Sequence, residues 1–522
     1  MVVERRPETV PQVLDVAAER FGDREALVDG SSRLTFAGLR DAARQVAGAF
    51  IGAGFGPGDR VAIWAPNRVE WVLALLGAHL AGAALVPINT RFKGREAAYA
   101  LRRSRAACLV VSGRFLGTDY PAMLSPYRSE LPALDRVIIL DEGGADGWAV
   151  FNDGGAAVSD GEVVRTASGV TAADVSDLMF TSGTTGEPKA VVATQGQTVW
   201  AYDEWSRLAG LAEGDRYLVV NPFFHSFGYK AGILACLLRG ATIIPEPVFD
   251  ARAVAETVAR EAVSVLPGPP TLFQSLLADR GGWDRQSAPL RLAVTGAANV
   301  PAELIFRMRD ELGFEDVLTG YGLTEATGVV ATCRVGDDAD RVSRTCGAPL
   351  PGVEVKVVAD DGAESPSGTP GELFVRGYNV MQGYFEEPDR TAEVITPDGW
   401  LRTGDVAVID EDGYISIVDR KKDMFIVGGF NAYPAEIENL LGQHPEVSQV
   451  AVVGAPDERL GEVGVAFVVP APGAEFDAES FVTWCRENVA NYKVPRRVHV
   501  VDRLPTNASG KVLKRELRAR VS

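Results

Sequence analysis

Short extended runs alternate with amphipathic helical patterns along most of this chain, and this alternation limits the folds that it can adopt. Residues 61–65 (VAIWA) and 84–88 (ALVPI) are short, apolar and β-rich, and residues 70–81 between them have helical spacing. The same order of patterns returns over residues 217–244 and 264–295. Units of strand, helix and strand predict mainly parallel sheets covered by helices, with ligands bound at the carboxyl ends of the strands.

The last third of the chain has a different pattern. Residues 353–358, 371–376 and 414–417 are expected strands, separated by Gly, Pro and Asp turns. They predict a β-rich subdomain over about residues 345–420. Earlier in the chain, residues 143–161 are rich in Gly, Ala and Asp and are expected to form a loop.

The charged segment DRKKD at residues 419–423 lies between two apolar runs and is a candidate hinge. Beyond it, two helical patterns and two strand patterns are enough for a small α+β domain: residues 434–441, 478–489, 449–453 and 463–469. We therefore predict an α/β fold with a large N-terminal domain, residues 1–420, that contains two helix-covered mixed or parallel sheets and the β-rich subdomain. A small mobile α+β domain, residues 421–522, follows it.

Charge and cysteine content exclude several classes of protein. The formal charge of the 522-residue chain is −18, and such a surface repels nucleic acids and anionic lipids. The five cysteines form no CxxC pair, and no two of the four histidines have metal-ligand spacing, so neither a disulfide scaffold nor a zinc site is expected. No signal peptide or membrane-spanning segment is visible, which predicts a soluble cytoplasmic protein.

Residues 177–190 (DLMFTSGTTGEPKA) combine an apolar strand with a loop suited to phosphate. Glycines expose backbone amides, four hydroxyl groups add donors, and Lys189 adds a positive charge. The chain has no Walker motif GxxxxGK[ST] and no GxGxxG after a strand, so neither a P-loop nucleotide hydrolase nor a dinucleotide enzyme is supported. An ordinary surface turn is the alternative for this segment.

Four further segments carry groups that suit nucleotide chemistry. Glu325, in TGYGLTEATG, is a carboxylate able to hold Mg²⁺, and Asp405, in WLRTGD, is an acceptor for a ribose diol. Lys511 lies in PTNASGK, and it is one of only nine lysines in a chain whose usual cation is arginine. His225 lies among aromatic residues in PFFHSFGYK. Taken one at a time, each of these side chains could equally be an ordinary turn or packing residue.

Taken together, these segments resemble the adenylate-forming superfamily of acyl-CoA synthetases, standalone adenylation domains and beetle-luciferase-like enzymes. The motifs TSGTTGEPK, GYGLTE, TGD, DRKKD and PTNASGK occur in family order and extend over essentially the whole chain. The resemblance implies ATP, Mg²⁺ and coenzyme A as cofactors and co-substrates, with a small carboxylic acid as the partner. It implies no nucleic acid and no integral membrane segment, and it leaves open whether the protein is a homodimer.

The resemblance also implies the roles of individual residues. Those expected around the pyrophosphate are Thr181, Ser182, Gly183, Thr184, Thr185 and Lys189. Those expected at the adenine and acyl sites are Gly296, Ala297, Ala298, Gly320, Tyr321 and Gly322. Thr324 would contact the α-phosphate, Glu325 the metal, and His225 the substrate carboxylate. The remaining expected contacts are Asp405 and Arg420 at the ribose, Lys511 as the catalytic lysine, Lys422 at the hinge, and Gly428 and Gly429 at the cofactor. Two positions depart from the family pattern: Ala190 replaces a usual glycine, and Gln195 replaces a histidine found in many members.

The implied reaction forms an acyl-AMP from a carboxylate and ATP, then transfers the acyl group to coenzyme A. Residues 217–274 look most like actinobacterial acyl-CoA synthetases of steroid-ring degradation, which activate a propanoate on a hexahydroindane ring pair. In this interpretation Gly228, Gly320 and Gly322 leave space for the ring, Lys230 meets a keto or hydroxyl group, and Phe227 and Leu323 line the site. A medium-chain fatty or aryl acid, a carrier-protein acceptor and a catalytically silent nucleotide-binding protein are the alternatives.

Overall fold

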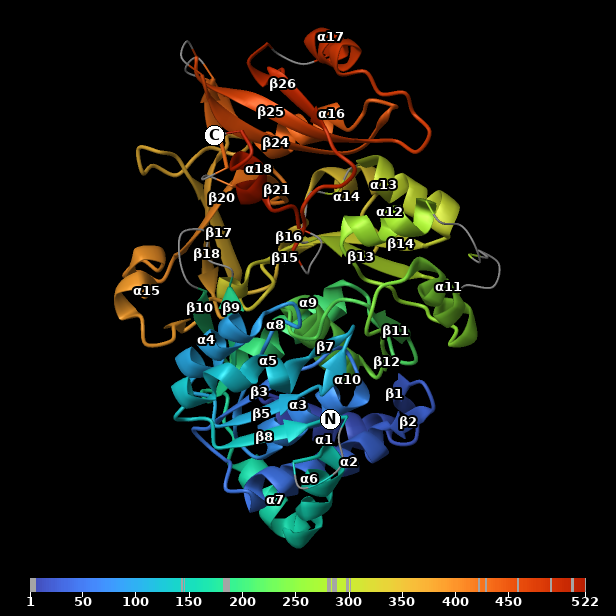
Figure 1. Cartoon of the computed structure of the whole chain (residues 1–522), viewed down its shortest axis with the longest axis vertical. Helices are drawn as coiled ribbons and strands as arrows, with labels where there is room; N and C mark the ends of the chain where they lie inside the picture. Colours follow the sequence, from blue (N-terminus) through green and yellow to red (C-terminus); the bar gives the residue numbers. More distant parts are fainter. Residues whose placement is uncertain are drawn as a thin grey trace.

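A computed structural model gives the arrangement of the chain (Figure 1). The residues that it describes are 6–141, 144, 146–181, 188–278, 283, 289–296, 300, 302–420, 423–427, 430–457, 460–488, 491–507 and 511–521. The first half of the chain, blue to green in Figure 1, lies at one end of the molecule, and the C-terminal strands and helices lie at the other end. The β-rich strands lie between them.

The largest described sheet has the strand order β19-β10-β9-β4-β3-β5-β8. Its strands are β3 (Arg60–Trp64), β4 (Ala84–Pro87), β5 (Cys108–Val111), β8 (Arg136–Ile139), β9 (Val175–Thr181), β10 (Lys189–Thr194) and β19 (Gly383–Tyr384). The predicted strand, helix, strand unit is confirmed, because β3 and β4 are parallel and α3 (Val69–Leu80) connects them. Strands β3 and β4 are almost entirely buried, as expected for parallel strands covered on both faces.

Two four-stranded groups, β11-β12-β1-β2 and β13-β14-β15-β16, form the second sheet region. Their strands are β1 (Glu25–Asp29), β2 (Ser32–Thr35), β11 (Arg216–Val219), β12 (Thr242–Pro245), β13 (Leu292–Gly296), β14 (Asp316–Tyr321), β15 (Ala331–Thr332) and β16 (Ala348–Pro349). The expected strand at residues 264–266 is only a bridge in the structure. Val265 pairs with Tyr217 on one side and Leu292 on the other, and so connects the two groups.

Helices of the N-terminal half begin where the sequence supplies caps. Thr9 accepts a hydrogen bond from the backbone N–H of Gln12 at the start of α1, and Thr35 accepts one from Gly38 at the start of α2. The described α-helices before residue 300 are α1 (Val10–Phe21), α2 (Phe36–Gly52), α3, α4 (Gly94–Ser104), α5 (Tyr120–Leu124), α6 (Trp148–Gly154), α7 (Asp160–Ser168), α8 (Gln195–Leu208), α9 (Ser226–Gly228), α10 (Ala235–Arg239), α11 (Ala251–Arg260) and α12 (Pro270–Ala278).

Two expectations for this half need correction. Residues 143–161 are not simply a loop, because Trp148 and Phe151 are buried against the core and fold this stretch into α6. The expected helix at residues 232–238 begins as a π-helix, η3 (Tyr229–Leu234), and only then continues as α10. Such π-helical turns occur often at functional sites.

The β-rich subdomain is confirmed as an antiparallel sheet with the order β17-β18-β20-β21. Its strands are β17 (Val353–Val358), β18 (Gly371–Gly377), β20 (Leu401–Ile409) and β21 (Ile415–Arg420). The described α-helices between residues 300 and 420 are α13 (Ala302–Arg307), α14 (Ala339–Arg344) and α15 (Pro388–Val394).

The C-terminal residues form a separate sheet with its own apolar core, which contains Phe425, Ile437, Phe467 and Phe481 among others. Its strands are β22 (Phe425–Val427), β23 (Phe430–Ala432), β24 (Val447–Asp457), β25 (Gly461–Pro470) and β26 (Arg497–Val500). Its helices are α16 (Pro434–Leu441), α17 (Ala478–Asn488) and α18 (Lys514–Arg518). The α+β pattern predicted after the hinge is therefore confirmed. None of the described helices is both long and apolar enough to cross a membrane.

Candidate active site

The predicted phosphate loop connects the antiparallel strands β9 and β10. Thr181 and Lys189 are cross-strand partners at its base, and the Thr181 hydroxyl donates to the Lys189 carbonyl at 3.5 Å. Ser182, Gly183, Thr184 and Thr185 lie outside the described residues. Ala190 lies within β10, is buried, and accepts a hydrogen bond from the Phe385 N–H at 2.8 Å. The replacement of glycine by alanine at this position therefore falls in a paired strand that tolerates a methyl group.

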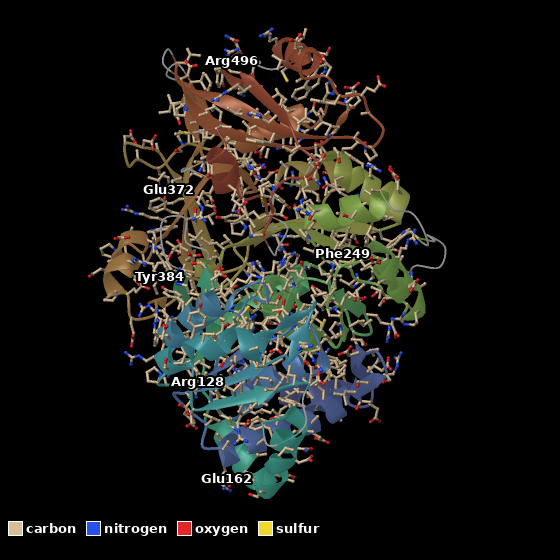
Figure 2. All side chains as sticks on the ribbon, viewed as in Figure 1. Arg128, Glu162, Phe249, Glu372, Tyr384 and Arg496 are labelled. Carbon is tan, nitrogen blue, oxygen red and sulfur yellow. The ribbon has the colours of Figure 1, made fainter. Side chains whose placement is uncertain are left out.

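Lys189 and Glu325 come together through a tyrosine that sequence analysis missed. The Tyr384 hydroxyl donates a hydrogen bond of 3.0 Å to Glu325 Oε1, and the Lys189 Nζ lies 4.5 Å from the Tyr384 ring centroid. Figure 2 labels Tyr384 beside α15. The pairing of Tyr384 with Val191 places it at the edge of the phosphate-loop hairpin. No local pattern marks this tyrosine, because its partners lie about 59 and 195 positions away along the sequence.

Thr324 and Glu325 lie in a short 3₁₀ helix, η5 (Thr324–Ala326), that ends with Thr327 in the left-handed region at φ 57°. The Thr327 hydroxyl donates to the Asn379 carbonyl at 2.7 Å, and the Glu325 carbonyl accepts from the Met381 N–H at 2.9 Å. These contacts attach the segment to the backbone of residues 379 and 381, just before β19. The position of the Glu325 carboxylate is therefore set by tertiary contacts with residues 379–384.

Glu325 suits Mg²⁺ better than a transition metal. Its carboxylate is a hard oxygen ligand, and it is only half-buried, so water can complete an octahedral shell. Within the described part of the chain, no three His, Cys, Asp or Glu side chains cluster in a way that could hold a metal ion. A single protein carboxylate matches the usual Mg²⁺ arrangement, in which phosphate oxygens and water supply most ligands.

The predicted ribose residues lie opposite each other on adjacent strands. Asp405 in β20 is the cross-strand partner of Arg420 in β21, and the Asp405 carboxylate is buried. Tyr321 donates a hydrogen bond of 2.6 Å to Asp405 Oδ2. The structure thus brings together two of the sequence motifs, GYGLTE and TGD, at one carboxylate.

The two glycine-bearing strand ends also meet. Gly296 and Gly320 are partners in the parallel pair β13 and β14, and a Cβ at Gly296 would lie 2.9 Å from the Gly320 carbonyl oxygen. Glycine is therefore required for this close approach of the two strand ends. Ala297 and Ala298 lie outside the described residues.

His225 caps the short turn before η3 in its neutral form. Its Nδ1 accepts a hydrogen bond from the Phe227 N–H at 3.2 Å, and burial lowers the pKa of the imidazole to about 4. A neutral ring that accepts at Nδ1 carries its proton on Nε2. His225 can therefore present one N–H donor to a substrate oxygen at neutral pH, without a positive charge.

We expect the His225 ring to remain neutral between pH 8 and pH 5, because its pKa of about 4 lies below that range. Histidine-labelled protein, with the signal assigned by His225→Gln, should show no change of the His225 ring NMR shift over this interval. The urea-unfolded protein is the control, since its histidines should titrate near about 6.5. A His225 midpoint near that value in the folded protein would contradict the assignment of a neutral donor.

The proposed space for a ring at the glycines is wrong in its detail. A Cβ at Gly228 would lie 2.2 Å from the Pro222 carbonyl oxygen, and one at Gly322 would lie 2.2 Å from the Gly328 carbonyl oxygen. At Gly320 the Ala331 carbonyl oxygen would lie 3.2 Å away. These glycines allow backbone segments to pack closely, so the room for an acyl group does not come from their missing side chains. The roles of Phe227 and Leu323, which are half-buried, stay predictions.

Lys230 is buried at the start of η3 and forms an ion pair with Asp177 in β9, at 2.9 Å. Both side chains are only 1% exposed. Burial lowers the Lys230 pKa, and the neighbouring Asp177 carboxylate opposes that shift. The ammonium that sequence analysis assigned to a substrate oxygen therefore has a structural partner inside the protein, and its contact with substrate stays a prediction.

Gln195, the second departure from the family pattern, is a buried connector. Its side-chain amide donates to His79 Nδ1 at 2.9 Å, and its Oε1 accepts from the Val10 N–H at 2.9 Å. His79 Nε2 in turn contacts the Tyr229 hydroxyl at 3.2 Å. Gln195 thus connects the starts of α1 and α8 to the π-helix, which is a structural role.

Lys511 lies in the C-terminal domain, in a turn closed by two hydrogen bonds with Asn507. The Lys511 N–H donates to Asn507 Oδ1 and the Asn507 N–H donates to the Lys511 carbonyl, both at 2.8 Å. The turn precedes α18, where Lys514 forms an ion pair with Glu438 at 2.8 Å. Lys422, Gly428 and Gly429 lie outside the described residues, as does the side chain of Arg420.

Comparison with known proteins gives a consistent result over the whole chain. Residues 14–385 match the family described as AMP-binding enzyme, and residues 436–511 match its C-terminal domain. The chain is 49% identical over 522 residues to a Rhodococcus jostii protein named 3-[(3aS,4S,7aS)-7a-methyl-1,5-dioxo-octahydro-1H-inden-4-yl]propanoyl:CoA ligase, with 98% of this chain and 99% of the relative covered. A Mycobacterium tuberculosis protein of the same name is 48% identical, with 98% of each chain covered. The structure is similar to that of an anthranilate CoA ligase in complex with anthranoyl-AMP, with a TM-score of 0.87, 29% identity, and 98% and 97% of the two chains covered.

Proposed function

Because the chain belongs to the AMP-binding enzyme family and is an AMP-forming acyl-CoA ligase, we propose that its substrate is a propanoate carried on a fused two-ring ketone. The observation that carries this proposal is the 49% and 48% identity, along nearly the full chain, to two ligases named for such an acid. Feruloyl-CoA synthases are 38% identical and medium-chain acyl-CoA ligases 33% identical. The ring-bearing propanoate is therefore the acid of the more similar relatives.

The reaction has two steps at one carbonyl group. In the first, a carboxylate oxygen attacks the α-phosphorus of ATP, and the bond to pyrophosphate breaks. In the second, the coenzyme A sulfur attacks the acyl carbon, the bond to AMP breaks, and the thiol proton is released. Both steps bring anions together, so the protein contributes orientation and positive charge more than proton transfer.

We propose that the side chains supply these contributions as follows. Lys189 binds the β- and γ-phosphates, together with the hydroxyl groups of the loop, which lie outside the described residues, and Asp405 accepts hydrogen bonds from the ribose. His225 donates its Nε2–H to the substrate carboxylate and orients the attacking oxygen. Glu325 would hold Mg²⁺, which neutralises phosphate charge when it is bound.

The C-terminal domain carries Lys511 and forms its own core, which suits it to move as a unit. We propose that Lys511 approaches the α-phosphate in the first step. The domain then turns about residues 419–423, which opens a path for the long pantetheine arm of coenzyme A. Lys422 lies at this hinge.

We expect a panel of acids to show a strong preference for the ring-bearing propanoate. The catalytic efficiency for AMP release with coenzyme A should exceed that for octanoate and ferulate by about 10-fold or more, since even one missing methylene group in an apolar pocket is worth about that factor. The same ring propanoate without its two keto groups is the matched control for the polar groups of the rings. Equal or better use of a linear or aryl acid would contradict the proposed substrate.

A further inference from the structure

Tyr384 touches the two charged groups that meet the phosphates of ATP, although it carries no charge. Its hydroxyl lies 3.0 Å from Glu325 Oε1, and its ring lies beneath the Lys189 ammonium at 4.5 Å. The side chain is only 7% exposed. We propose that Tyr384 is a positioning residue that holds the metal-binding carboxylate and the phosphate-binding lysine in fixed relation to each other. This inference rests on the AMP-forming reaction and not on the identity of the acid.

The hydrogen bond gives the two oxygens of Glu325 different tasks. Oε1 accepts from the Tyr384 hydroxyl, and among the described residues no hydrogen bond reaches Oε2. A carboxylate fixed in this way presents one oxygen to a metal without losing rotational freedom on binding. Partners that orient metal ligands typically change metal affinity by about 10-fold to 100-fold when they are removed.

The aromatic ring restrains Lys189. A lysine side chain has four rotatable bonds, and without a contact its ammonium group would sample many positions near the loop. A cation over the face of an aromatic ring is attracted to it, which favours one position of the ammonium by about 2-fold to 5-fold. The ring therefore places the ammonium beside the loop before ATP arrives.

The backbone around Tyr384 is anchored on both sides, so the ring itself has a fixed position. The Gln382 N–H donates to the Val192 carbonyl at 2.9 Å, and the Phe385 N–H donates to the Ala190 carbonyl at 2.8 Å. The Tyr384 N–H donates to the Thr391 hydroxyl at 2.9 Å. The backbone around Tyr384 therefore pairs with β10, the strand that carries Lys189, and Met381 in the same stretch binds the Glu325 carbonyl. The Tyr384 side chain contacts the side chains of the same two residues, Lys189 and Glu325.

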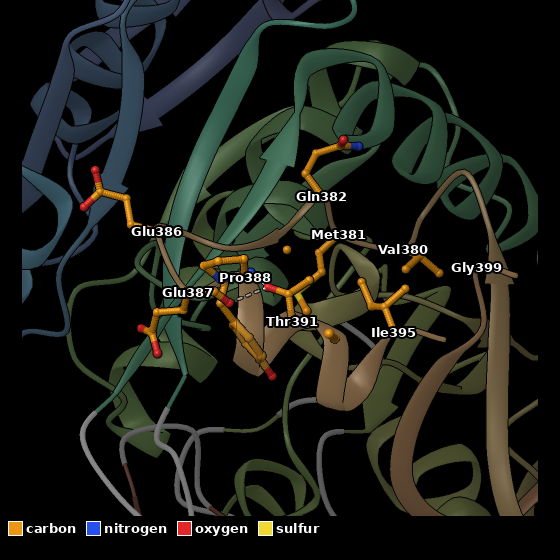
Figure 3. A pocket seen from close by; sticks show the side chains of 12 residues that line it. Val380, Met381, Gln382, Glu386, Glu387, Pro388, Thr391, Ile395 and Gly399 are labelled. Carbon is orange, nitrogen blue, oxygen red and sulfur yellow. Dashed lines mark hydrogen bonds between the residues drawn. The ribbon is translucent and has the colours of Figure 1, made fainter. Parts of the chain in front are cut away.

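Tyr384 also belongs to the lining of an open pocket of about 660 Å³, which Figure 3 shows from close by. Its lining includes Val380, Met381, Ile395 and Tyr384 but neither Lys189 nor Glu325. Tyr384 thus contributes both to this pocket and to the contacts with the two charged groups.

The test uses two variants of the full chain. Tyr384→Phe removes only the hydroxyl group, and Tyr384→Leu removes the ring as well. Calorimetric binding of ATP, without acid or coenzyme A, is measured over a series of Mg²⁺ concentrations. Mg²⁺ is expected to increase the affinity for ATP, and for Tyr384→Phe we expect the Mg²⁺ concentration that gives half of this increase to rise by about 10-fold. The ATP affinity at saturating Mg²⁺ should stay nearly normal. For Tyr384→Leu we expect an additional loss of about 2-fold to 5-fold in ATP affinity at saturating Mg²⁺.

Two comparisons separate positioning from a general structural effect. Tyr414→Phe is the matched control, because the Tyr414 hydroxyl also donates to a carboxylate, that of Asp337 at 2.9 Å, but in another part of the fold. It should change neither the Mg²⁺ dependence nor the ATP affinity. In a Glu325→Gln background, Tyr384→Phe should cause no further change in Mg²⁺ dependence, since both changes act on one ligand. An unchanged Mg²⁺ dependence in Tyr384→Phe, or additive effects in the double variant, would overturn the role of Tyr384. Failure of the unaltered protein to bind ATP would instead contradict the proposed function itself.

Discussion

Replacement of Lys511 by alanine is expected to reduce acid-dependent exchange of pyrophosphate into ATP by about 100-fold or more. Loss of a preorganised positive group at a developing charge typically costs that factor. In the proposed reaction Lys511 neutralises charge between the carboxylate and the α-phosphate, and this neutralisation is needed only in the first step. The variant should therefore still convert a supplied acyl-AMP and coenzyme A to acyl-CoA and AMP.

Lys356→Ala is the matched control for this experiment. Lys356 lies in β17 over the Trp400 ring, with its Nζ 4.3 Å from the ring centroid, and has no role in the proposed reaction. Its exchange rate should equal that of the unaltered protein. If Lys511→Ala retained normal exchange, the role of the C-terminal lysine would have to be abandoned.

Replacement of Lys230 by methionine is expected to lower the free energy of unfolding by about 3–5 kcal/mol, the usual cost of breaking a buried ion pair. The variant leaves the Asp177 carboxylate buried, and the side-chain hydrogen bond that remains to it within the described part of the chain is a weak one of 3.4 Å from the Thr198 hydroxyl. Urea unfolding followed by fluorescence of the N-terminal domain tryptophans measures the change. The rate of acyl-AMP formation should fall together with the stability, because Asp177 and Lys230 connect β9, the strand before the phosphate loop, to the π-helix that follows His225.

The double variant Asp177→Leu/Lys230→Met shows whether this loss comes from the unpaired charge. With both charges removed, most of the stability should return, because apolar side chains of similar size can replace a buried ion pair at little cost. Normal stability of Lys230→Met alone would show that the pair has no structural role, and would favour the alternative in which the ammonium contacts substrate.

The sequence was sufficient to predict the elements whose signals are local. Helical spacing and caps such as Thr35 identified α2, and the apolar runs flanking α3 identified the parallel pair β3 and β4. The motif residues Thr181, Glu325 and Asp405 were recognised because several polar groups occur together at strand ends or turns. In the structure these residues lie in, or just after, strands of three different sheets, and the contacts between the motifs come from Tyr384, which donates to Glu325, and from Tyr321, which donates to Asp405.

The contacts that could not be predicted join residues far apart in the sequence. Tyr384 reaches its partners only because β19 pairs with β10 in the folded chain. Lys230 finds its partner, Asp177, only because the fold brings β9 next to the π-helix. Gly228 was interpreted as open space, because a sequence does not reveal which carbonyl oxygens fill the place of a missing side chain. Tertiary packing decides each of these cases, and local patterns contain no information about it.

The acidic composition of the chain is compatible with three anionic substrates, because a few lysine side chains lie in the motifs assigned to substrate binding. Lys189 lies over Tyr384 next to the Glu325 carboxylate, and Lys511 lies on the domain beyond the hinge. In the proposed reaction the positive charge at the site comes from these lysines and from the Mg²⁺ that Glu325 would hold, while the net charge of −18 is distributed over the whole chain.

The proposed two-step reaction is tested most directly by product analysis in a single turnover with the ring-bearing propanoate. Enzyme in excess, ATP and the acid are mixed without coenzyme A, and the quenched products are measured by mass spectrometry. The account predicts that one acyl-AMP and one pyrophosphate form per acid, and that later addition of coenzyme A converts the acyl-AMP to acyl-CoA and AMP. Release of ADP and phosphate, or acyl-CoA formation without a preceding acyl-AMP, would contradict it.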